Sequence, residues 1–383
     1  MKAIIAGGGT GGHLFPAIAL AEELRSRRTD LPLLFVGVEG GVEASLLAAR
    51  GWEFEGIRAS GLQGKRLRSR LRSLTLVPAG LIRSFSILRR FRPDVIVGFG
   101  GYASAAMVLS GVLAKVPTVI HEQNAFPGLT NRWLGKVVDR VAIAFEEASG
   151  FFPQRKVQVT GNPVRKELFG VRRAEALTRL NLDQDRLTVL IFGGSQGAHR
   201  LNQAIMEALP MLAGERERIQ FIHATGPRDL AAAQQGYDAD GYRAMVKPFF
   251  EAMAAVYAAA DLCFCRAGAG TVAELCALGK PSVLTPFPFA ANDHQRYNAE
   301  ALVASGGARM VLDRDLSGVL VAEFIRTCLR DRQGLEEMAH RAKGLARPDA
   351  AVRLADLVVE TAHAYRANCQ VINPKPETAQ RSL

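Results

Sequence analysis

Cysteine and long apolar runs are scarce in this sequence. Its five cysteines are an odd number without the paired spacing of a disulfide framework or a metal site. A reducing compartment, the cytoplasm, is therefore expected. No run of about 18 apolar residues occurs, so no segment is expected to span a bilayer. The apolar residues at the N-terminus end at Gly7, which is too short a run for a signal peptide.

Acidic residues are missing from one segment. Between Gly56 and Pro93 the chain has ten basic residues and no acidic one. The whole chain carries 48 − 37 = +11, so the residues outside this segment carry only 38 − 37 = +1. The charge excess is local and predicts an anionic partner, either a membrane surface or a nucleic acid. Only two aromatic residues lie in the segment, which gives little base stacking, so no nucleic acid is expected.

A strand, a glycine-rich loop and a helix occur twice. Residues 4–13 align without a gap with residues 190–199, and a helical pattern follows each loop, at Leu14–Leu24 and Leu201–Leu209. Such a unit opens a doubly wound domain, so the expected fold class is α/β with two Rossmann-like domains. Further strands are expected at Leu33–Val38, Val95–Gly98, Thr118–Ile120, Val141–Ala144, Phe221–Ala224, Leu262–Cys265 and Ser282–Leu284.

Turn residues at 160–165 indicate the domain boundary. We expect an N-terminal domain over 1–162 and a C-terminal domain over 163–348. A last helix over 349–367 is expected to pack back on the first domain, and residues 370–383 read as a disordered polar tail.

The first glycine loop contains G-x-G-x-x-G at Gly7, Gly9 and Gly12, a weak signal for an anion at a helix N-terminus. A nicotinamide or flavin enzyme would need an acid at the end of the second strand, and Glu39, followed by two glycines, suits that role poorly. His13 follows the loop where the helix starts. It is a candidate general base or substrate contact, and a plain capping or packing role stays open.

In the second half, the strand Leu262–Cys265 runs into a small-residue loop and a helix that ends at Gly279. The N–H groups around Gly270 and Thr271 are suited to an anion such as a diphosphate. Glu274, one turn into the helix, can accept two hydrogen bonds from a ribose diol, and an ordinary first-turn acid remains the alternative. The Asp-x-Asp triplets at Asp183, Asp238 and Asp313 read as solvated loop acids, so neither a metal nor another cofactor is expected.

Together these motifs closely resemble the MurG family of N-acetylglucosaminyltransferases. The resemblance runs from residue 7 to about 350 and rests on residues 8–16, 100–102, 121–124, 161–165, 193–197 and 293–295. It implies a glycosyltransferase B-type fold, with the two domains facing across a cleft. It also implies inverting transfer from UDP-N-acetylglucosamine to undecaprenyl-diphospho-N-acetylmuramoyl pentapeptide, in peptidoglycan synthesis. A UDP-sugar epimerase of the same fold, and a nucleic-acid-binding protein using 56–93, are the alternatives.

The resemblance also implies roles for individual residues. Glu274 would bind the ribose, Gln295 the sugar, and Phe250 would neighbour the uracil. The diphosphate would be bound by Ser195, Ala269, Gly270 and Thr271. From the other side the donor would be enclosed by Thr10, Gly11, Gly12, Asn124 and Arg165. His13 is the first candidate for the base that activates the acceptor hydroxyl, and Glu122 is the reserve.

The basic segment contains Leu74, Val77, Leu81, Phe85 and Leu88 at helical spacing. An apolar face beside bases suits an anionic membrane, where each Lys or Arg contributes roughly 1 kcal/mol. The expected membrane contacts are Lys65, Arg66, Arg68, Arg70, Arg72, Leu81 and Phe85. The expected location is therefore peripheral, on the cytoplasmic face of the cell membrane.

Overall fold

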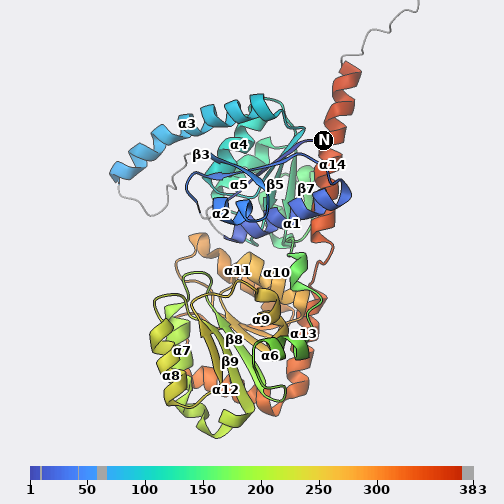
Figure 1. Cartoon of the computed structure of the whole chain (residues 1–383). Helices are drawn as coiled ribbons and strands as arrows, with labels where there is room; N and C mark the ends of the chain where they lie inside the picture. The colour runs from blue at the N-terminus through green and yellow to red at the C-terminus, as the bar shows by residue number, and fades with distance from the viewer. Residues whose placement is uncertain (9–10, 42, 58–66, 373–383) are drawn as a thin grey trace, which may run out of the picture. The chain divides into compact units, whose positions relative to one another are not determined.

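The computed structural model describes residues 1–8, 11–41, 43–57 and 67–372, and of residues 67–77 and 366–372 the backbone alone. The chain divides into two compact units (Figure 1). The first comprises Met1–Gln123, Pro127–Gly161 and the chain from Asp349 onward, and the second comprises Asn124–Phe126 and Asn162–Pro348. The boundary falls between Gly161 and Asn162, one residue before the expected position. Residues 124–126 also depart from the expectation, because they belong to the second unit.

The first unit contains a parallel sheet of seven strands in the order β3-β2-β1-β4-β5-β6-β7. The order reverses between β1 and β4, which makes the carboxyl ends of these two strands the expected ligand-binding edge. The strands are β1 (Ala3–Ala6), β2 (Leu33–Val38), β3 (Glu53–Ile57), β4 (Val95–Gly98), β5 (Thr118–Glu122), β6 (Arg140–Ile143) and β7 (Val157–Val159).

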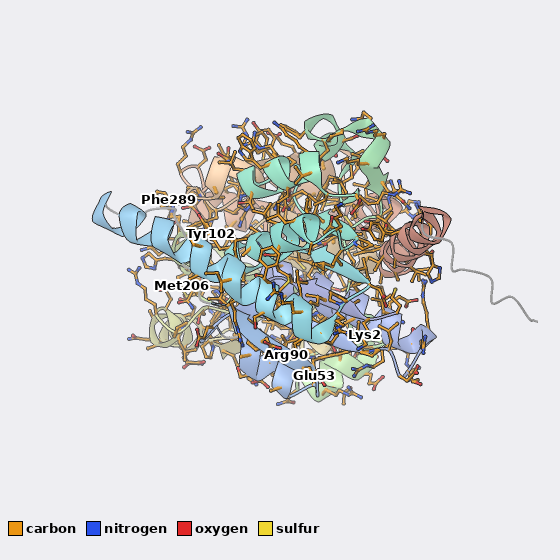
Figure 2. The ribbon with its side chains drawn as sticks, turned by 90° about the horizontal axis from the view of Figure 1, so that it is seen from above. Lys2, Glu53, Arg90, Tyr102, Met206 and Phe289 are labelled. Carbon is orange, nitrogen blue, oxygen red and sulfur yellow. The ribbon has the colours of Figure 1, made fainter. Side chains whose placement is uncertain are left out.

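Helices cover both faces of this sheet, and each face has its own buried cluster. One face packs against α1 (Gly11–Arg27), α2 (Glu43–Ala48) and α14 (Ala350–Ile372). The other packs against α3 (Leu67–Phe91), α4 (Tyr102–Leu113) and α5 (Leu129–Val137). Figure 2 shows α3 running across this second face, with Arg90 near its C-terminal end.

The final helix α14 packs against α1 and contributes Leu354, Leu357 and Val358 to the first unit's buried cluster. It extends to Ile372, so residues 370–372 are helical where a tail was expected, and residues 373–383 lie outside the described residues. Within the described part of the chain, no helix is both long and apolar enough to cross a membrane.

The second unit repeats the architecture with six parallel strands in the order β10-β9-β8-β11-β12-β13. They are β8 (Leu187–Phe192), β9 (Ile219–Ala224), β10 (Ala244–Lys247), β11 (Leu262–Cys265), β12 (Ser282–Leu284) and β13 (Ala308–Met310). Its α-helices are α6 (Arg173–Arg179), α7 (His199–Ala208), α8 (Leu230–Ala239), α9 (Met253–Ala259), α10 (Ala269–Leu278), α11 (His294–Ala304), α12 (Gly318–Arg330) and α13 (Arg332–Gly344).

Short 3-10 helices link the regular elements at Glu146–Phe151, Gln154–Lys156, Lys166–Leu168, Pro210–Arg218 and Ala291–Asp293. The order of strands in the second sheet reverses between β8 and β11, as it does between β1 and β4 in the first. The expected fold class, two doubly wound α/β domains, is confirmed.

Candidate active site

In the first unit, the loops after β1 and β4 lie side by side because Ala6 pairs with Gly98. Two glycines in the second loop make this approach possible. A Cβ on Gly101, whose φ is 85°, would lie 3.0 Å from the carbonyl oxygen of Gly8. A Cβ on Gly100, whose φ is 104°, would lie 2.9 Å from the imidazole of His13. A larger residue at either position would strain the backbone and displace the loop or the imidazole.

His13 is half-buried in the first turn of α1, and its Nδ1 lies 3.1 Å from Oε1 of Gln123, which follows β5. The orientation of the Gln123 amide is determined by its other contacts. Its Nε2 donates to the carbonyl oxygens of Phe99 and His121, both at 3.0 Å, and a carbonyl can only accept. The atom facing His13 is therefore an acceptor, so Nδ1 of His13 carries the proton and Nε2 carries the lone pair.

His121 completes this chain of contacts from inside the protein. Its Nε2 donates to the carbonyl oxygen of Gly161 at 3.0 Å, and its Nδ1 accepts from Nε2 of Gln123 at 3.1 Å. Burial lowers the pKa of His121 to about 4, so the imidazole is neutral at pH 7. A neutral, fixed His121 thus holds Gln123 in the orientation that sets the His13 tautomer.

Glu122, the reserve base, is 2% exposed. Its Oε2 accepts from the backbone N–H of Gly128 at 3.1 Å and from Nδ2 of Asn131 at 2.9 Å. These donors belong to the N-terminus of α5, so the carboxylate caps that helix. A carboxylate buried in this way is poorly placed to take a proton from a substrate, which argues against the reserve role. Gly11 and Gly12 are exposed at the start of α1, and Thr10 lies outside the described residues.

In the second unit, the loops after β8 and β11 are neighbours because Phe192 pairs with Cys265. Each leads into a helix whose N-terminus has no side-chain cap, α7 and α10. Backbone N–H groups at such a terminus attract anions. Ser195 is exposed in the first loop. Ala269, Gly270 and Thr271 form the first turn of α10, where Ala269 is buried and the other two are half-buried. Gly279 ends α10 in the left-handed conformation (φ 60°), as expected.

His199 corresponds to His13 in the sequence repeat and occupies the first turn of α7. Its Nδ1 lies 2.9 Å from Oδ1 of Asp229, and its side chain is 43% exposed. Asp229 also accepts from Nδ2 of Asn202 at 2.8 Å. The partner of this second histidine is therefore a carboxylate, where His13 has an amide.

Glu274 lies one turn into α10, and both of its carboxylate oxygens have donors. Nη2 of Arg165 donates to Oε1 at 3.2 Å, and the Tyr257 hydroxyl donates to Oε2 at 2.9 Å. Burial raises the pKa of Glu274, while the positive charge of Arg165 and the Tyr257 hydrogen bond oppose that change. Arg165 belongs to the second unit, as the expected boundary at residue 163 requires, and Glu274 and Glu167 hold its guanidinium there.

Asn124 was expected in the first domain, but it belongs to the second unit. Contacts with other residues of the second unit explain its position. Nδ2 of Asn298 donates to Oδ1 of Asn124 at 3.1 Å, and Oδ1 of Asn298 accepts from the backbone N–H of Ala125 at 2.8 Å. Phe126 stacks on Tyr297 with a centroid distance of 5.2 Å. Asn298 is fully buried, so it fastens this short segment to α11.

Two further expected donor contacts, Gln295 at the start of α11 and Phe250 in the loop after β10, belong to the second unit. Oε1 of Gln295 accepts from the backbone N–H of Phe287 at 3.0 Å, which ties the start of α11 to the loop after β12. Asn292 and Asp293, just before it, have left-handed φ values of 53° and 54°. Phe250 is 5% exposed beneath the ammonium of Lys247, whereas Phe249 is 49% exposed. Of this pair, Phe249 is therefore the more accessible to a base.

The three Asp-x-Asp triplets differ in their surroundings. Asp313 forms an ion pair with Arg266 at 2.5 Å and is largely buried, so it is not the solvated acid that we expected. Asp238 lies within α8 and not in a loop. In the described parts of the chain, no three His, Cys, Asp or Glu side chains gather as a metal site would require.

The basic segment is only partly described. Lys65 and Arg66 lie outside the described residues, as do the side chains of Arg68, Arg70 and Arg72. The apolar residues expected to face a membrane include Phe85 and Leu88. Leu88 is 6% exposed and belongs to a buried cluster of the first unit, and Phe85 packs against that cluster. These two residues therefore stabilise the core of the first unit. Leu81 is half-buried. Arg83 and Arg90 both form ion pairs with Glu55 on β3, an acid just outside the segment.

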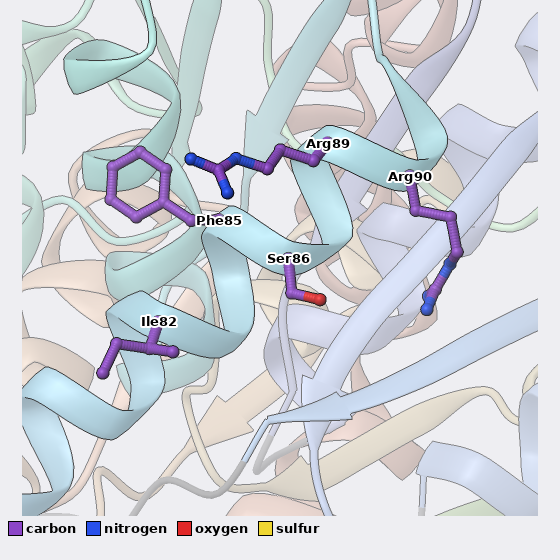
Figure 3. Close-up of a pocket in the computed structure, with 5 residues that line it drawn as sticks. All are labelled: Ile82, Phe85, Ser86, Arg89 and Arg90. Atoms are coloured by element: carbon purple, nitrogen blue, oxygen red, sulfur yellow. The ribbon is translucent and has the colours of Figure 1, made fainter.

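An open groove of about 620 Å³ lies on the described end of α3, lined by Ile82, Phe85, Ser86, Arg89 and Arg90. Figure 3 shows the Arg89 guanidinium on the same side of the helix as the Phe85 ring, while Arg90 points to the other side. Ile82, with 71% of its side chain exposed, is the large apolar residue on the described part of α3 that is most accessible to solvent.

The sequence reasoning did not identify a second apolar stripe, on α5. Leu129, Trp133 and Val137 are 51–64% exposed, and their spacing of four residues places them on one side of the helix. The ammonium of Lys136 lies 4.8 Å from the centre of the Trp133 ring. The spacing of four residues was the signal in the sequence that could have identified this stripe. It is informative only if residues 129–137 are first predicted to form a helix.

Comparison with known proteins gives a consistent result. The N-terminal domain of glycosyltransferase family 28 matches residues 3–143 and the C-terminal domain matches residues 188–354. A relative from Myxococcus xanthus (strain DK1622) is 46% identical over 360 residues, which are 94% of this chain and 93% of that protein. It is named UDP-N-acetylglucosamine--N-acetylmuramyl-(pentapeptide) pyrophosphoryl-undecaprenol N-acetylglucosamine transferase.

Among solved structures, Acinetobacter baumannii MurG has a TM-score of 0.72 and 29% identity, with 94% of this chain and 99% of that one covered. A UDP-N-acetylglucosamine 2-epimerase has a TM-score of 0.67 at 14% identity, covering 96% of this chain and 98% of that one. At that identity the likeness shows the fold alone. The glycosyltransferase B-type fold is therefore shared, while the similarity at higher identity is to the transferases.

Proposed function

Because the chain belongs to glycosyltransferase family 28, we propose that it catalyses the transfer for which its curated relatives are named. N-acetylglucosamine passes from UDP-N-acetylglucosamine to the 4-hydroxyl of the muramoyl sugar in undecaprenyl-diphospho-N-acetylmuramoyl pentapeptide. The step converts lipid I to lipid II in peptidoglycan synthesis, and through it the enzyme serves cell shape and division. The relatives named for this reaction match 94% of the chain, and the two domains of glycosyltransferase family 28 match the residues of both glycine loops.

In this proposal the second unit holds the donor. The diphosphate lies at the N-terminus of α10, contacted by Ala269, Gly270, Thr271 and Ser195. Glu274 accepts from the ribose hydroxyls, Gln295 contacts the sugar, and the Phe249–Phe250 turn neighbours the uracil. Uncapped N–H groups and a carboxylate with two remaining acceptor positions suit a nucleoside diphosphate.

His13 is the general base. The observation that carries this assignment is the chain from His121 through Gln123, in which Oε1 of Gln123 accepts from Nδ1 of His13 and so favours the tautomer with the lone pair on Nε2. A sugar hydroxyl is a weak nucleophile, so a positioned base accelerates its attack by about 10²–10⁴-fold. In-line attack on the anomeric carbon inverts its configuration and gives a β linkage.

The departing UDP gains negative charge, which the N-terminus of α10 stabilises through its dipole and its free N–H groups. A divalent metal is therefore not required in this proposal. Turnover that persists in a chelator supports this part of the mechanism. Turnover that a chelator abolishes and added Mg²⁺ restores would overturn it.

The same proposal places the enzyme on the cytoplasmic face of the membrane, bound through the helices α3, α4 and α5. These helices cover one face of the first sheet, and the large apolar side chains exposed on their described parts are Ile82, Leu113, Leu129, Trp133 and Val137. Arg89, Lys115 and Lys136 are exposed on the same three elements or at their ends. An apolar surface with a tryptophan and interspersed bases suits an anionic bilayer.

The transfer is tested by UDP release from UDP-N-acetylglucosamine with and without a lipid-diphospho-muramoyl acceptor. Release that depends on the acceptor, with a disaccharide product identified by mass, supports the proposal. Release of UDP without acceptor, or none with it, contradicts the transferase assignment. Formation of an epimeric UDP-sugar would favour the epimerase alternative.

A further inference from the structure

Tyr257 has a hydroxyl whose position calls for an explanation. Its side chain is 1% exposed in the short helix α9, and its ring meets Phe192 edge to face with a centroid distance of 5.7 Å. Phenylalanine would fill the same space and keep this packing. A buried hydroxyl costs free energy unless it is hydrogen-bonded, and the bond that satisfies this one is to Oε2 of Glu274.

That bond constrains the carboxylate on one side, and Arg165 constrains it on the other. Each oxygen of Glu274 accepts from one protein donor, Arg165 at Oε1 and Tyr257 at Oε2. A carboxylate oxygen has two acceptor positions, so one remains on each oxygen. Two parallel acceptor positions match the two hydroxyls of a vicinal diol.

We propose that Tyr257 is a positioning residue for the donor nucleotide: by donating to Oε2 it orients Glu274 so that both carboxylate oxygens accept from the ribose diol. The inference rests on the proposed function, in which Glu274 meets the ribose. Without the hydroxyl, Glu274 keeps only the Arg165 contact and can rotate about it. In some of the resulting orientations only one oxygen of the Glu274 carboxylate can accept from the ribose.

Because Glu274 is largely buried, loss of the Tyr257 hydrogen bond should have a large effect on its carboxylate. Glu274 is 15% exposed at its side chain, so little water is present to replace a lost donor. The charged groups that act on it are Arg165, which favours the carboxylate, and Glu167, which opposes it. The Tyr257 hydroxyl also favours the carboxylate, and a charged acceptor binds hydroxyls more strongly than a neutral one. Orientation and charge therefore depend on the same hydrogen bond.

The test is calorimetric binding of UDP and 2′-deoxy-UDP to wild type, Tyr257→Phe, Glu274→Gln and the double variant. Tyr257→Phe should weaken UDP binding about tenfold and 2′-deoxy-UDP binding much less. The double variant should bind UDP no more weakly than Glu274→Gln alone. In the transfer assay, Tyr257→Phe should raise KM for the donor and leave kcat within about twofold.

The matched control is Tyr237→Phe, the same change at a fully buried tyrosine of the same unit whose hydroxyl contacts His223 at 3.1 Å. It should leave UDP affinity unchanged. The inference is overturned if Tyr257→Phe weakens both nucleotides equally, if it adds to the loss in Glu274→Gln, or if it has no effect. A selective loss for UDP in a protein that transfers no sugar would support the inference and contradict the proposed function.

Discussion

The two units contain the same succession of strand, glycine-rich segment and helix, yet their aligned histidines have different partners. His13 faces the amide of Gln123, which a buried neutral histidine holds in place, whereas His199 faces the carboxylate of Asp229. The partner follows another strand in each unit: Gln123 comes directly after β5, and Asp229 lies between β9 and α8. The repeat determines where the histidine lies, and the residues that follow other strands of the sheet determine its chemistry.

The polar groups at the two ligand-binding edges also differ. The first unit brings together imidazole and amide groups, which suit the transfer of a proton from a neutral hydroxyl. The second brings together an arginine, a carboxylate and two uncapped helix N-termini, which suit a charged nucleotide. One architecture thus places different polar groups at the carboxyl ends of its two sheets.

The largest difference should appear when each histidine is removed. His13→Ala is expected to lower kcat about 10³-fold with little change in donor affinity, because the general base is lost. His199→Ala is the matched control and should keep kcat within about threefold. Steady-state kinetics with the lipid acceptor measure both. Full activity in His13→Ala, or an equal loss in the two variants, would abolish the distinction between the units.

The partners of the two histidines give the next largest effect. Gln123→Met removes the acceptor for Nδ1 of His13 and should lower kcat about 30-fold, because the productive tautomer is no longer favoured. Asp229→Asn changes the partner of His199 and should leave kcat nearly unchanged. Donor KM should change little in either variant. If Gln123→Met retains the wild-type kcat, the tautomer argument for His13 is wrong.

The two units should lose similar amounts of stability at acidic pH, because each contains one buried, neutral histidine. Burial lowers the pKa of His121 to about 4 and that of His223 to about 3, below the unfolded value of 6.5. The unfolded chain therefore binds more protons below pH 6.5, and stability falls as the pH drops through that value. From pH 7 to pH 5 each histidine should cost about 2 kcal/mol.

Urea unfolding at the two pH values measures this cost. Replacing either histidine by glutamine should reduce the acid-induced loss of stability, by a similar amount in each unit. A variant that loses as much stability as wild type between pH 7 and pH 5 would show that the replaced histidine does not titrate as its burial requires.

The smallest expected effect is on binding to lipid vesicles, for which we compare one exposed apolar residue from each unit. Trp133→Ser should lower binding to vesicles of anionic lipid about fivefold, because an exposed indole is lost from α5. Val319→Ser removes an exposed apolar residue from α12 of the second unit and should leave vesicle binding unchanged. Co-sedimentation at two salt concentrations measures both. Equal binding by the two variants would exclude α5 from the membrane contact.

The sequence predicted the interior of each sheet better than its edges. Strands β1, β2, β4, β8, β11 and β12 were found close to their expected bounds, and their residues are almost entirely buried. The four edge strands, β3, β7, β10 and β13, were not predicted. Their residues are mostly half-exposed and include Glu, Gln, Lys and Arg, so they lack the apolar run that identifies a strand buried on both faces.

Local structure was predicted where a motif and its structural role lie in one stretch of chain. The helix that carries Glu274 was found as expected and ends at Gly279, because a strand, a loop and a helix cap are local features. The pairing of Arg83 and Arg90 with Glu55, and the attachment of Asn124 to Asn298, join distant residues. No periodicity indicates such contacts, so the sequence predicted neither the ion pairs of Glu55 nor the place of Asn124 in the second unit.

The return of α14 to the first unit has a consequence for synthesis on the ribosome. Five residues of α14 complete a buried cluster whose remaining members lie between Ala3 and Ala142; the five are Leu354, Ala355, Leu357, Val358 and Ala362. The emerging first unit therefore leaves one sheet face incomplete until the whole second unit has been translated. Such a nascent chain is a candidate for chaperone binding, and a separately made 1–161 fragment should become soluble when the 349–372 peptide is supplied in trans.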